Sequence, residues 1–152
     1  MSDNAQPQFA LQRIYLKDAS LEVPNAPQAF AKEWKPEVQI DLNTSARKLD
    51  EQHYEVIVKV TATATNGGEN AFLVELVQAG LFALINIPEE QVRPMLGAMC
   101  PNILFPYLRE SLDSLVIKGG FPALMLAPIN FDALYQQRLA QEQAQAQTET
   151  TH

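Results

Sequence analysis

LGAMCPNILFPYLRESLDSLVIK, from Leu96 to Lys118, carries apolar side chains on more sides than are needed to cover an ordinary core. At about 100° per residue its apolar side chains form one wide stripe and a second patch on the opposite side of a helix expected over residues 102–118. The stripe contains Leu104, Phe105, Leu108, Leu112, Leu115 and Val116, and the second patch contains Ile103 and Tyr107. A helix that is apolar on two sides, in a chain this short, favours a position between its own domain and another subunit. The sequence therefore predicts an oligomer. Arg109 and Asp113 are spaced to pair on this helix.

Composition restricts the class of protein. The chain has 152 residues with 47% hydrophobic content, which supports a single domain with a real core. A net charge of -7 argues against nucleic acid and anionic membranes as partners. One cysteine excludes an internal disulfide framework and is typical of a reducing compartment. With no secretory leader pattern and no apolar run of roughly 18 residues, we expect a cytoplasmic protein that is neither secreted nor inserted in a membrane.

Four strands are expected before the helix. Apolar and polar residues alternate over residues 9–23, with a bend at Asp18, and again over 38–42, 54–65 and 70–80. Asn66-Gly-Gly-Glu69 is a strong hairpin signal, because Asn and Gly accept the positive φ of tight turns. Strands joined locally in this way predict a four-stranded antiparallel sheet, and with the helices an α+β fold.

Prolines and glycines punctuate the second half of the chain. A short helix or turn is expected near residues 89–95, and breaks or kinks are expected at Pro94, Gly97, Pro101 and Pro106. Gly119-Gly120 should end the long helix, residues 121–128 should form an extended crossover, and Asn130 should cap a last helix. The chain therefore divides into a disordered N-terminus (1–8), one domain (9–141) and a flexible, Gln-rich tail (142–152).

No sequence motif points to catalysis or to a cofactor. Nucleotide-binding loops, zinc-protease and serine-hydrolase signatures are absent from the sequence. Cys100 lies in an apolar setting, where a thiol stays protonated and inert, and His53 is its only non-terminal candidate base. One cysteine and two histidines cannot fill a four-coordinate site within one chain. We expect no catalytic residue, no metal and no cofactor, although a cysteine-dependent enzyme and an adaptor for one folded partner stay open as alternatives.

Surface character favours binding. Val38, Ile40 and Leu42 form the apolar side of an alternating strand, and an apolar loop supplies Phe121, Leu124, Met125, Leu126 and Ile129. These two stretches are candidates for opposing walls of a groove, since methionine and unbranched apolar side chains adapt to varied partners. The alternative is that they only fill the core of their own domain. Phe30 and Trp34 are interpreted as core residues because of their size.

Several runs resemble one family. The chain resembles the SecB family of bacterial protein-export chaperones in four runs, which occur in the same order as in the family. These runs are Arg13–Pro27, Trp34–Val38, Cys100–Glu110 and Gly120–Leu134. The resemblance covers roughly residues 9–141. It implies an ATP-independent chaperone that holds unfolded precursor proteins in an export-competent state and delivers them to the SecA motor ATPase. It also implies helices on one side of the sheet and a homotetramer built as a dimer of dimers.

The resemblance also assigns residues to surfaces. Docking of SecA falls on Asp18, Glu22, Leu73 and Glu75, and the groove for unfolded clients falls on Val38, Ile40, Leu42, Phe121, Leu124, Met125 and Leu126. The helix between subunits would contribute Ile103, Leu104, Tyr107, Leu108, Leu112 and Leu115. Family members often end in a more acidic segment that contacts a small zinc-bearing domain of SecA. Here only Glu142 and Glu149 are acidic after the last expected helix.

Overall fold

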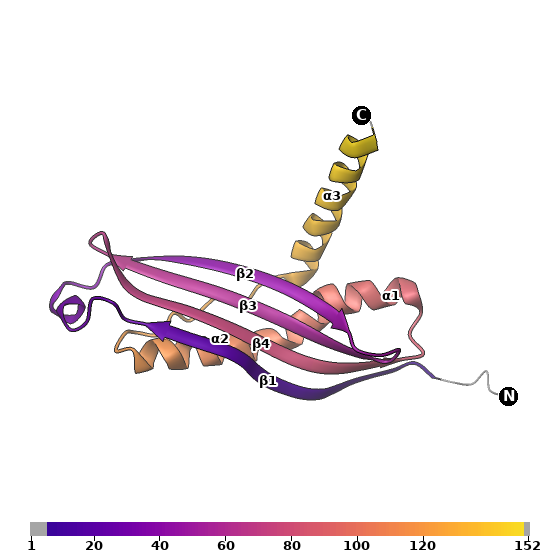
Figure 1. Ribbon diagram of the computed structural model, residues 1–152, viewed down its shortest axis with the longest axis horizontal. Helices are drawn as coiled ribbons and strands as arrows, with labels where there is room; N and C mark the ends of the chain where they lie inside the picture. The colour runs from indigo at the N-terminus through magenta and orange to yellow at the C-terminus, as the bar shows by residue number, and fades with distance from the viewer. Residues whose placement is uncertain (1–5, 151–152) are drawn as a thin grey trace.

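The computed structural model of the chain describes residues 6–150, with side chains through 148. One four-stranded antiparallel sheet, in the order β1-β4-β3-β2, carries helices on one side, which confirms the predicted α+β fold (Figure 1). The elements are β1 (Gln8–Glu22), η2 (Gln28–Ala31), β2 (Pro36–Lys48), β3 (His53–Asn66), β4 (Glu69–Ile85), α1 (Glu89–Pro94), η3 (Met95–Met99), α2 (Cys100–Lys118) and α3 (Phe131–Thr150). Of the segment predicted to be disordered, Gln8 already belongs to β1, and residues 1–5 lie outside the described part.

The sheet follows the alternation of the sequence, with longer strands than expected. β3 and β4 form the predicted hairpin, in which Gly67 and Gly68 adopt φ of 63° and 83°. β1 shifts its register twice, and the second shift, between Leu16 and Asp18, lies at the expected bend. β2 continues to Lys48, because its pairing with β3 extends past the apolar positions from which the sequence defined it. β1 and β2 are the two edges of the sheet.

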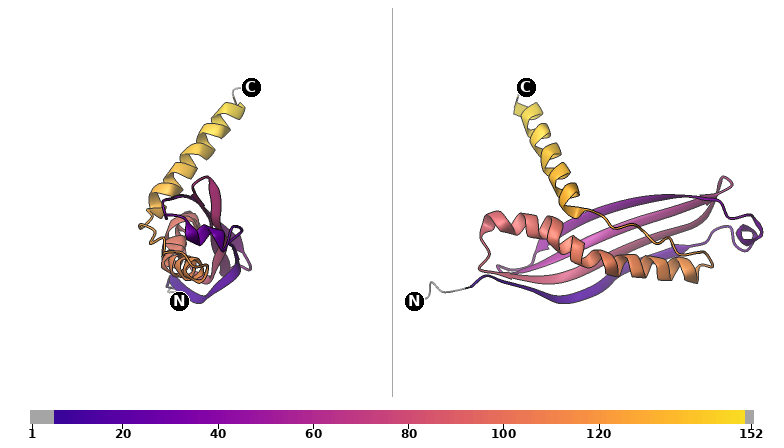
Figure 2. Two further views of the ribbon diagram at one scale, coloured as in Figure 1. Left: turned by 90° about the vertical axis from the view of Figure 1, so that its left-hand side faces the viewer. Right: turned by 180° about the vertical axis from the view of Figure 1, so that it is seen from behind.

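Of the breaks or kinks expected around the long helix, the structure shows a bend and no break over residues 89–118 (Figure 2). α1, η3 and α2 follow one another without an intervening loop, although three prolines lie within them. Pro101 lies just after η3, whose π-helical geometry rearranges the backbone hydrogen bonds between Pro94 and Pro101 and so accommodates both prolines. The result is the bent helical rod that Figure 2 shows across the sheet.

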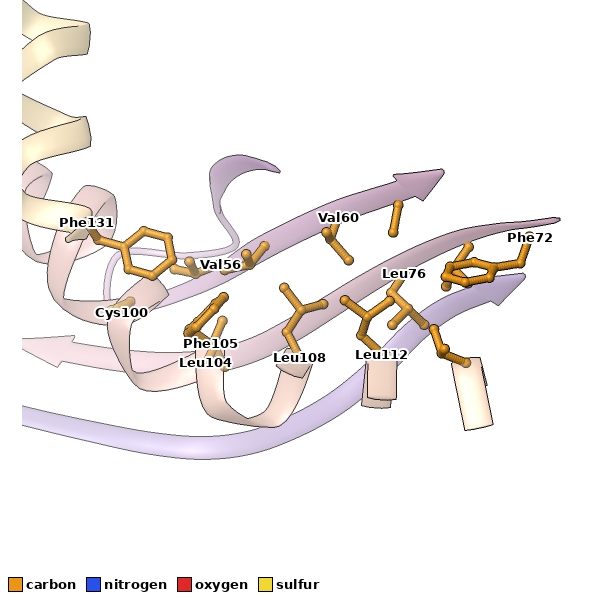
Figure 3. Packing of buried hydrophobic residues seen from close by; sticks show 14 of the residues in the cluster. Val56, Val60, Phe72, Leu76, Cys100, Leu104, Phe105, Leu108, Leu112 and Phe131 are labelled. Carbon is orange, nitrogen blue, oxygen red and sulfur yellow. The ribbon is translucent and has the colours of Figure 1, made fainter. Parts of the chain in front are cut away.

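The core lies between α2 and the inner face of the sheet (Figure 3). Leu104, Leu108 and Leu112 are fully buried there within a single chain, so their prediction as subunit-interface residues is wrong. Sequence periodicity identifies the apolar side of a helix, but it does not identify the surface against which that side packs. In this chain the apolar side of α2 packs on β3 and β4. The opposite side of α2 still bears Ile103, half-buried, and Tyr107, which is 49% exposed. The sixth predicted interface residue, Leu115, is half-buried beside the core.

The chain returns to the sheet through an irregular segment and ends in a helix. Residues 121–130 contain no helix or strand, as predicted, and Asn130 Oδ1 accepts a hydrogen bond from Ala133 N at 3.0 Å, which confirms the predicted cap. α3 then points away from the sheet (Figure 1) and continues to Thr150, where the sequence predicts a flexible tail from residue 142. Ala, Gln and Glu favour helix, which explains this extension. Within residues 6–150, no helix is both long and apolar enough to cross a membrane.

Candidate functional site

An aromatic pocket lies where α2 ends and β2 begins. The ring of Phe121 contacts three other rings, with centroid distances of 5.3 Å to Phe30, 5.0 Å to Trp34 and 5.2 Å to Phe72. Gly120, at φ 91°, lets Phe30 approach so closely that a Cβ there would lie 2.8 Å from the ring. The pocket is lined by Ala29, Phe30, Lys32, Trp34, Gly120, Phe121 and Pro122. An apolar side chain of a partner would find flat aromatic walls here.

Two phenylalanines at this pocket differ in exposure from what the sequence predicted. Phe30, interpreted as a core residue, is 51% exposed, whereas Phe121, predicted as an exposed groove wall, is only 5% exposed. Phe121 is buried because Phe72 of β4 packs on its ring from the sheet side. It therefore supports the pocket from beneath, and Phe30 and Trp34 provide most of the accessible wall. Only tertiary packing distinguishes these positions, since all three are large apolar rings in the sequence.

The inner side of β2 is an apolar strip along an edge of the sheet. Ile40 and Leu42 are half-buried, and Val38 is 40% exposed. Their partners on β3, namely Ala64 for Val38, Ala62 for Ile40 and Val60 for Leu42, are fully buried core residues. Paired residues in an antiparallel sheet point to the same side, so the strip faces the helices and continues the core outward. The structure thus brings all three predicted strand residues onto one surface.

A second pocket lies at the far end of this strip, at the base of α3. Leu42, Thr44, Gly97, Phe131, Leu134, Tyr135, Gln137, Arg138 and Gln141 line it. Tyr135 packs so closely on Gly97 that a Cβ there would lie 2.5 Å from its ring. Arg138 Nη2 donates to Thr44 Oγ1 at 3.1 Å, which ties α3 to β2. This pocket was not predicted from the sequence, although a glycine such as Gly97 in a helical stretch indicates close approach of another element.

The crossover segment forms the neighbouring surface. It returns on the helix side of the sheet (Figure 2), and there Leu124, Leu126 and Ile129 pack, half-buried, against the core. Met125, by contrast, is 78% exposed and has a φ of 52°. The sequence left open whether this segment forms a groove wall or fills the core of its own domain. Both apply, because three of its apolar side chains pack on the core and Met125 is exposed.

One helix residue holds the crossover segment. Asp113 Oδ1 accepts hydrogen bonds from the backbone N–H groups of Leu124, at 3.0 Å, and Met125, at 3.2 Å. The sequence spacing instead suggested that Asp113 pairs with Arg109. The guanidinium of Arg109 lies over the ring of Phe105, 5.8 Å from its centroid.

The four predicted docking residues share the outer face of the sheet. Ser20 and Glu22 of β1 lie opposite Glu75 and Leu73 of β4, and Asp18 lies opposite Val77. A shallow depression there is lined by Ser20, Glu22, Thr61, Leu73, Val74 and Glu75. Glu75 Oε1 is 3.9 Å from Lys59 Nζ and accepts a hydrogen bond from Thr61 Oγ1 at 3.4 Å. The face thus offers a half-buried leucine among carboxylates, an arrangement that suits a basic partner.

A different carboxylate is nearly buried at the other end of that face. Glu55 of β3 accepts hydrogen bonds from the Tyr15 hydroxyl and, at 2.9 Å, from Lys17 Nζ, and Arg47 Nη2 lies 3.5 Å away. The Tyr15 hydrogen bond, followed by Lys17, lowers the pKa of Glu55, while burial and then the Glu55 contact raise the pKa of Tyr15 to about 12. Both acceptor oxygens are used structurally, so this cluster joins β1 to β3 across β4.

Neither of the residues considered for catalysis lines either pocket. Cys100 is fully buried, and burial raises the pKa of its thiol to about 12, as the sequence predicted in direction. His53 Nδ1 lies 2.8 Å from Asp50 Oδ1 at a strand end. In the described part of the chain, no three His, Cys, Asp or Glu side chains gather to hold a metal ion.

Known proteins resemble this chain in sequence and in fold. The family model described as preprotein translocase subunit SecB matches residues 2–142. The protein-export protein SecB of Marinobacter nauticus is 53% identical over 151 residues, covering 97% of this chain and 92% of the relative, and that of Pseudomonas paraeruginosa is 51% identical over 150 residues, covering 98% and 92%. A solved SecB-like chaperone of Mycobacterium tuberculosis, in complex with a peptide from an antitoxin, has the same fold, with a TM-score of 0.62 at 18% identity over 80% of this chain and 90% of that one.

Proposed function

Because this chain belongs to the SecB family of protein-export chaperones, we propose that it binds unfolded precursor segments along the inner side of β2, between the aromatic pocket and the pocket at the base of α3. Family membership makes the chain a chaperone for preprotein export and not an enzyme. The buried thiol of Cys100 agrees with this, since a protonated cysteine is no nucleophile.

One observation carries the choice of surface. Trp34 lines the first pocket, Leu42 lines the second, and between them Val38 and Ile40 point to the same side of β2. A strand rises about 3.3 Å per residue, so this strip accommodates an extended segment of several residues. Holding such a segment needs no nucleotide, because burying its apolar side chains is favourable by itself.

The backbone of β2 adds a second source of affinity. β2 is an edge strand, so one row of its N–H and C=O groups has no neighbour in the sheet. An unfolded client in an extended conformation can pair with such a row whatever its sequence, while apolar side chains enter the flanking pockets. This combination supports recognition of unfolded chains rather than of one folded partner, which is the adaptor alternative.

The family suggests two further partners. We propose that the outer face around Asp18, Glu22, Leu73 and Glu75 docks the SecA motor, and that a second side of α2 joins copies of the chain into a tetramer. Docking of SecA is supported by the acidic side chains and the apolar Leu73 on the outer face of the sheet. The tetramer is supported by the exposed apolar side chains on the rigid helix α2.

The test of the client surface replaces Ile40 and Leu42 together by alanine. If the double variant removes roughly 60 Å² of the apolar area that an unfolded client buries, the dissociation constant of the client should rise about tenfold. The measurement is titration with a permanently unfolded, carboxymethylated protein, and separately with the same protein in its native state.

The matched control replaces Gln39 and Asp41 by alanine, because they alternate with the tested residues and point to the outer side of the same strand. This control should keep wild-type affinity. Equal affinity in the Ile40/Leu42 variant and the control would move the client surface away from β2. Preference of the wild type for the native protein would favour the adaptor.

A further inference from the structure

We propose that Asp113 is a positioning residue for client binding, which fixes the crossover segment as one wall of the client surface. The inference rests on the proposed function, because the crossover segment runs from the aromatic pocket, which Phe121 and Pro122 line, to the pocket at the base of α3, which Phe131 lines. It assigns to one carboxylate on α2 a role that neither the sequence pattern nor the packing of the core requires.

The first support is the geometry of the bond. Two successive backbone N–H groups, of Leu124 and Met125, converge on a single oxygen, Asp113 Oδ1, at 3.0 and 3.2 Å. Successive N–H groups near a left-handed residue form a small concavity that favours an anion. Met125 supplies that left-handed residue, with a φ of 52°, a conformation that is unfavourable for a side chain with a Cβ. The carboxylate therefore stabilises a backbone shape that the segment would not prefer by itself.

The second support is the rigidity of the anchor. Asp113 follows Leu112 and lies three residues before Val116, and both neighbours are fully buried against the sheet. The helix cannot shift there without disturbing the core. The crossover segment has no helix or strand of its own, so its shape depends on contacts such as this one.

The consequence concerns which side chains a client meets. With the backbone held, Leu124 and Leu126 stay half-buried against the core, and Met125 between them is 78% exposed. An exposed, flexible methionine on a fixed backbone is suited to varied apolar partners, and fixing the backbone in advance lowers the entropy cost of binding. Without the carboxylate, the two N–H groups lose their acceptor and the segment samples other shapes.

The experiment compares Asp113→Ala with Asp113→Asn in the full chain. Alanine removes the acceptor, and asparagine keeps one acceptor oxygen without the charge. In the alanine variant we expect amide hydrogen exchange at Leu124 and Met125 to accelerate about tenfold, and the dissociation constant for the carboxymethylated client to rise about three- to tenfold. Asparagine should recover most of both effects. Glu90→Ala, which removes an exposed carboxylate on α1, is the charge-matched control.

Two outcomes would overturn the inference: unchanged exchange at both amides, or faster exchange with unchanged client affinity. If Asp113→Ala unfolds the chain, the asparagine variant still decides. Because a neutral amide oxygen accepts more weakly than a carboxylate, exchange at both amides should be about two- to threefold faster than in the wild type, and the dissociation constant for the client should rise by a similar factor. The Ile40/Leu42 variant separates this inference from the proposed function. If that variant loses client affinity while Asp113→Ala binds as the wild type does, only the positioning role fails; if neither changes affinity, the client surface itself is misplaced.

Discussion

Glu55 shows what a single residue contributes to this sheet. Its side chain is 6% exposed, and Tyr15, Lys17 and Arg47 surround it from β1 and β2. A nearly buried carboxylate is costly unless it is hydrogen-bonded and paired, and here it is both. The sequence shows this glutamate at an ordinary alternating position, so its partners are evident only when β1 and β2 lie on either side of the two central strands.

Replacing Glu55 by glutamine should lower the free energy of unfolding by about 1–3 kcal/mol at pH 7, because charge-assisted hydrogen bonds are lost. The pKa of Glu55 is lowered in the folded state, so its contribution is present above the unfolded pKa, about 4.3, and is lost as the pH falls through the lower folded value. The difference between wild type and Glu55→Gln should therefore shrink below about pH 4.3. Denaturant unfolding at a series of pH values checks this, and a difference that is constant with pH would contradict it.

At the scale of elements, the two faces of one sheet are assigned to different partners. The inner side of β2 carries the apolar strip, and the outer sides of β1 and β4 carry the acids around Leu73. Alternation makes this possible, because neighbouring residues of a strand point to opposite sides. On the proposed assignment, a client and the motor protein bind opposite faces of the same chain, and variants on one face should leave binding of the other partner unaffected.

Charge reversal of Glu75 to lysine should weaken binding of SecA, most visibly at low salt, since exposed charges are screened beyond a Debye length of roughly 10 Å at 0.1 M. Affinity for the motor measured against salt concentration, beside affinity for the unfolded client, checks this. Glu37→Lys on the outer side of β2 is the control, with the same charge change at another place on the face. A fall in client binding with intact motor binding would mean that the two faces are assigned the wrong way round.

On the scale of the whole molecule, one side of the long helix carries apolar side chains that residues 6–150 leave largely exposed. α2 packs Leu104, Leu108 and Leu112 on the sheet, and the opposite side bears exposed apolar residues. Met99 is 40% exposed, Tyr107 49% and Ile117 58%, and these lie at spacings that place them on one side of the helix. Apolar residues gathered on a rigid helix are typical of an interface between copies, which is why a tetramer is proposed.

Tyr107→Asp should dissociate the tetramer without unfolding the chain, because an unpaired charge in a packed interface costs several kcal/mol while the tyrosine makes little contact with its own core. Sedimentation should give about four times the 16.9 kDa of one chain for the wild type and a smaller mass for the variant. Leu112→Asp is the contrast, since that residue is fully buried and its replacement should unfold the chain. A wild-type monomer at micromolar concentration, or a tetrameric Tyr107→Asp, would contradict this interface.

Local sequence patterns were enough to place most of the helices and strands and to indicate the class of protein. Alternation located the four strands, Asn66-Gly-Gly-Glu69 located the hairpin, and the apolar stretch located α2 to within two residues. These are properties of near neighbours, because periodicity and turn chemistry act over a few residues. The resemblance of whole runs indicates the SecB family from the sequence alone, and the comparisons confirm it.

Tertiary structure alone decided how these elements meet. It placed the leucine stripe of α2 on the sheet instead of at another subunit, exposed Phe30 while burying Phe121, and gave the carboxylate of Asp113 to the crossover segment. Each of these depends on residues far apart in the sequence, and a pattern along one element is the same whichever surface it packs on. A side chain is buried only when a second surface packs against it, and that second surface comes into place only when the chain folds.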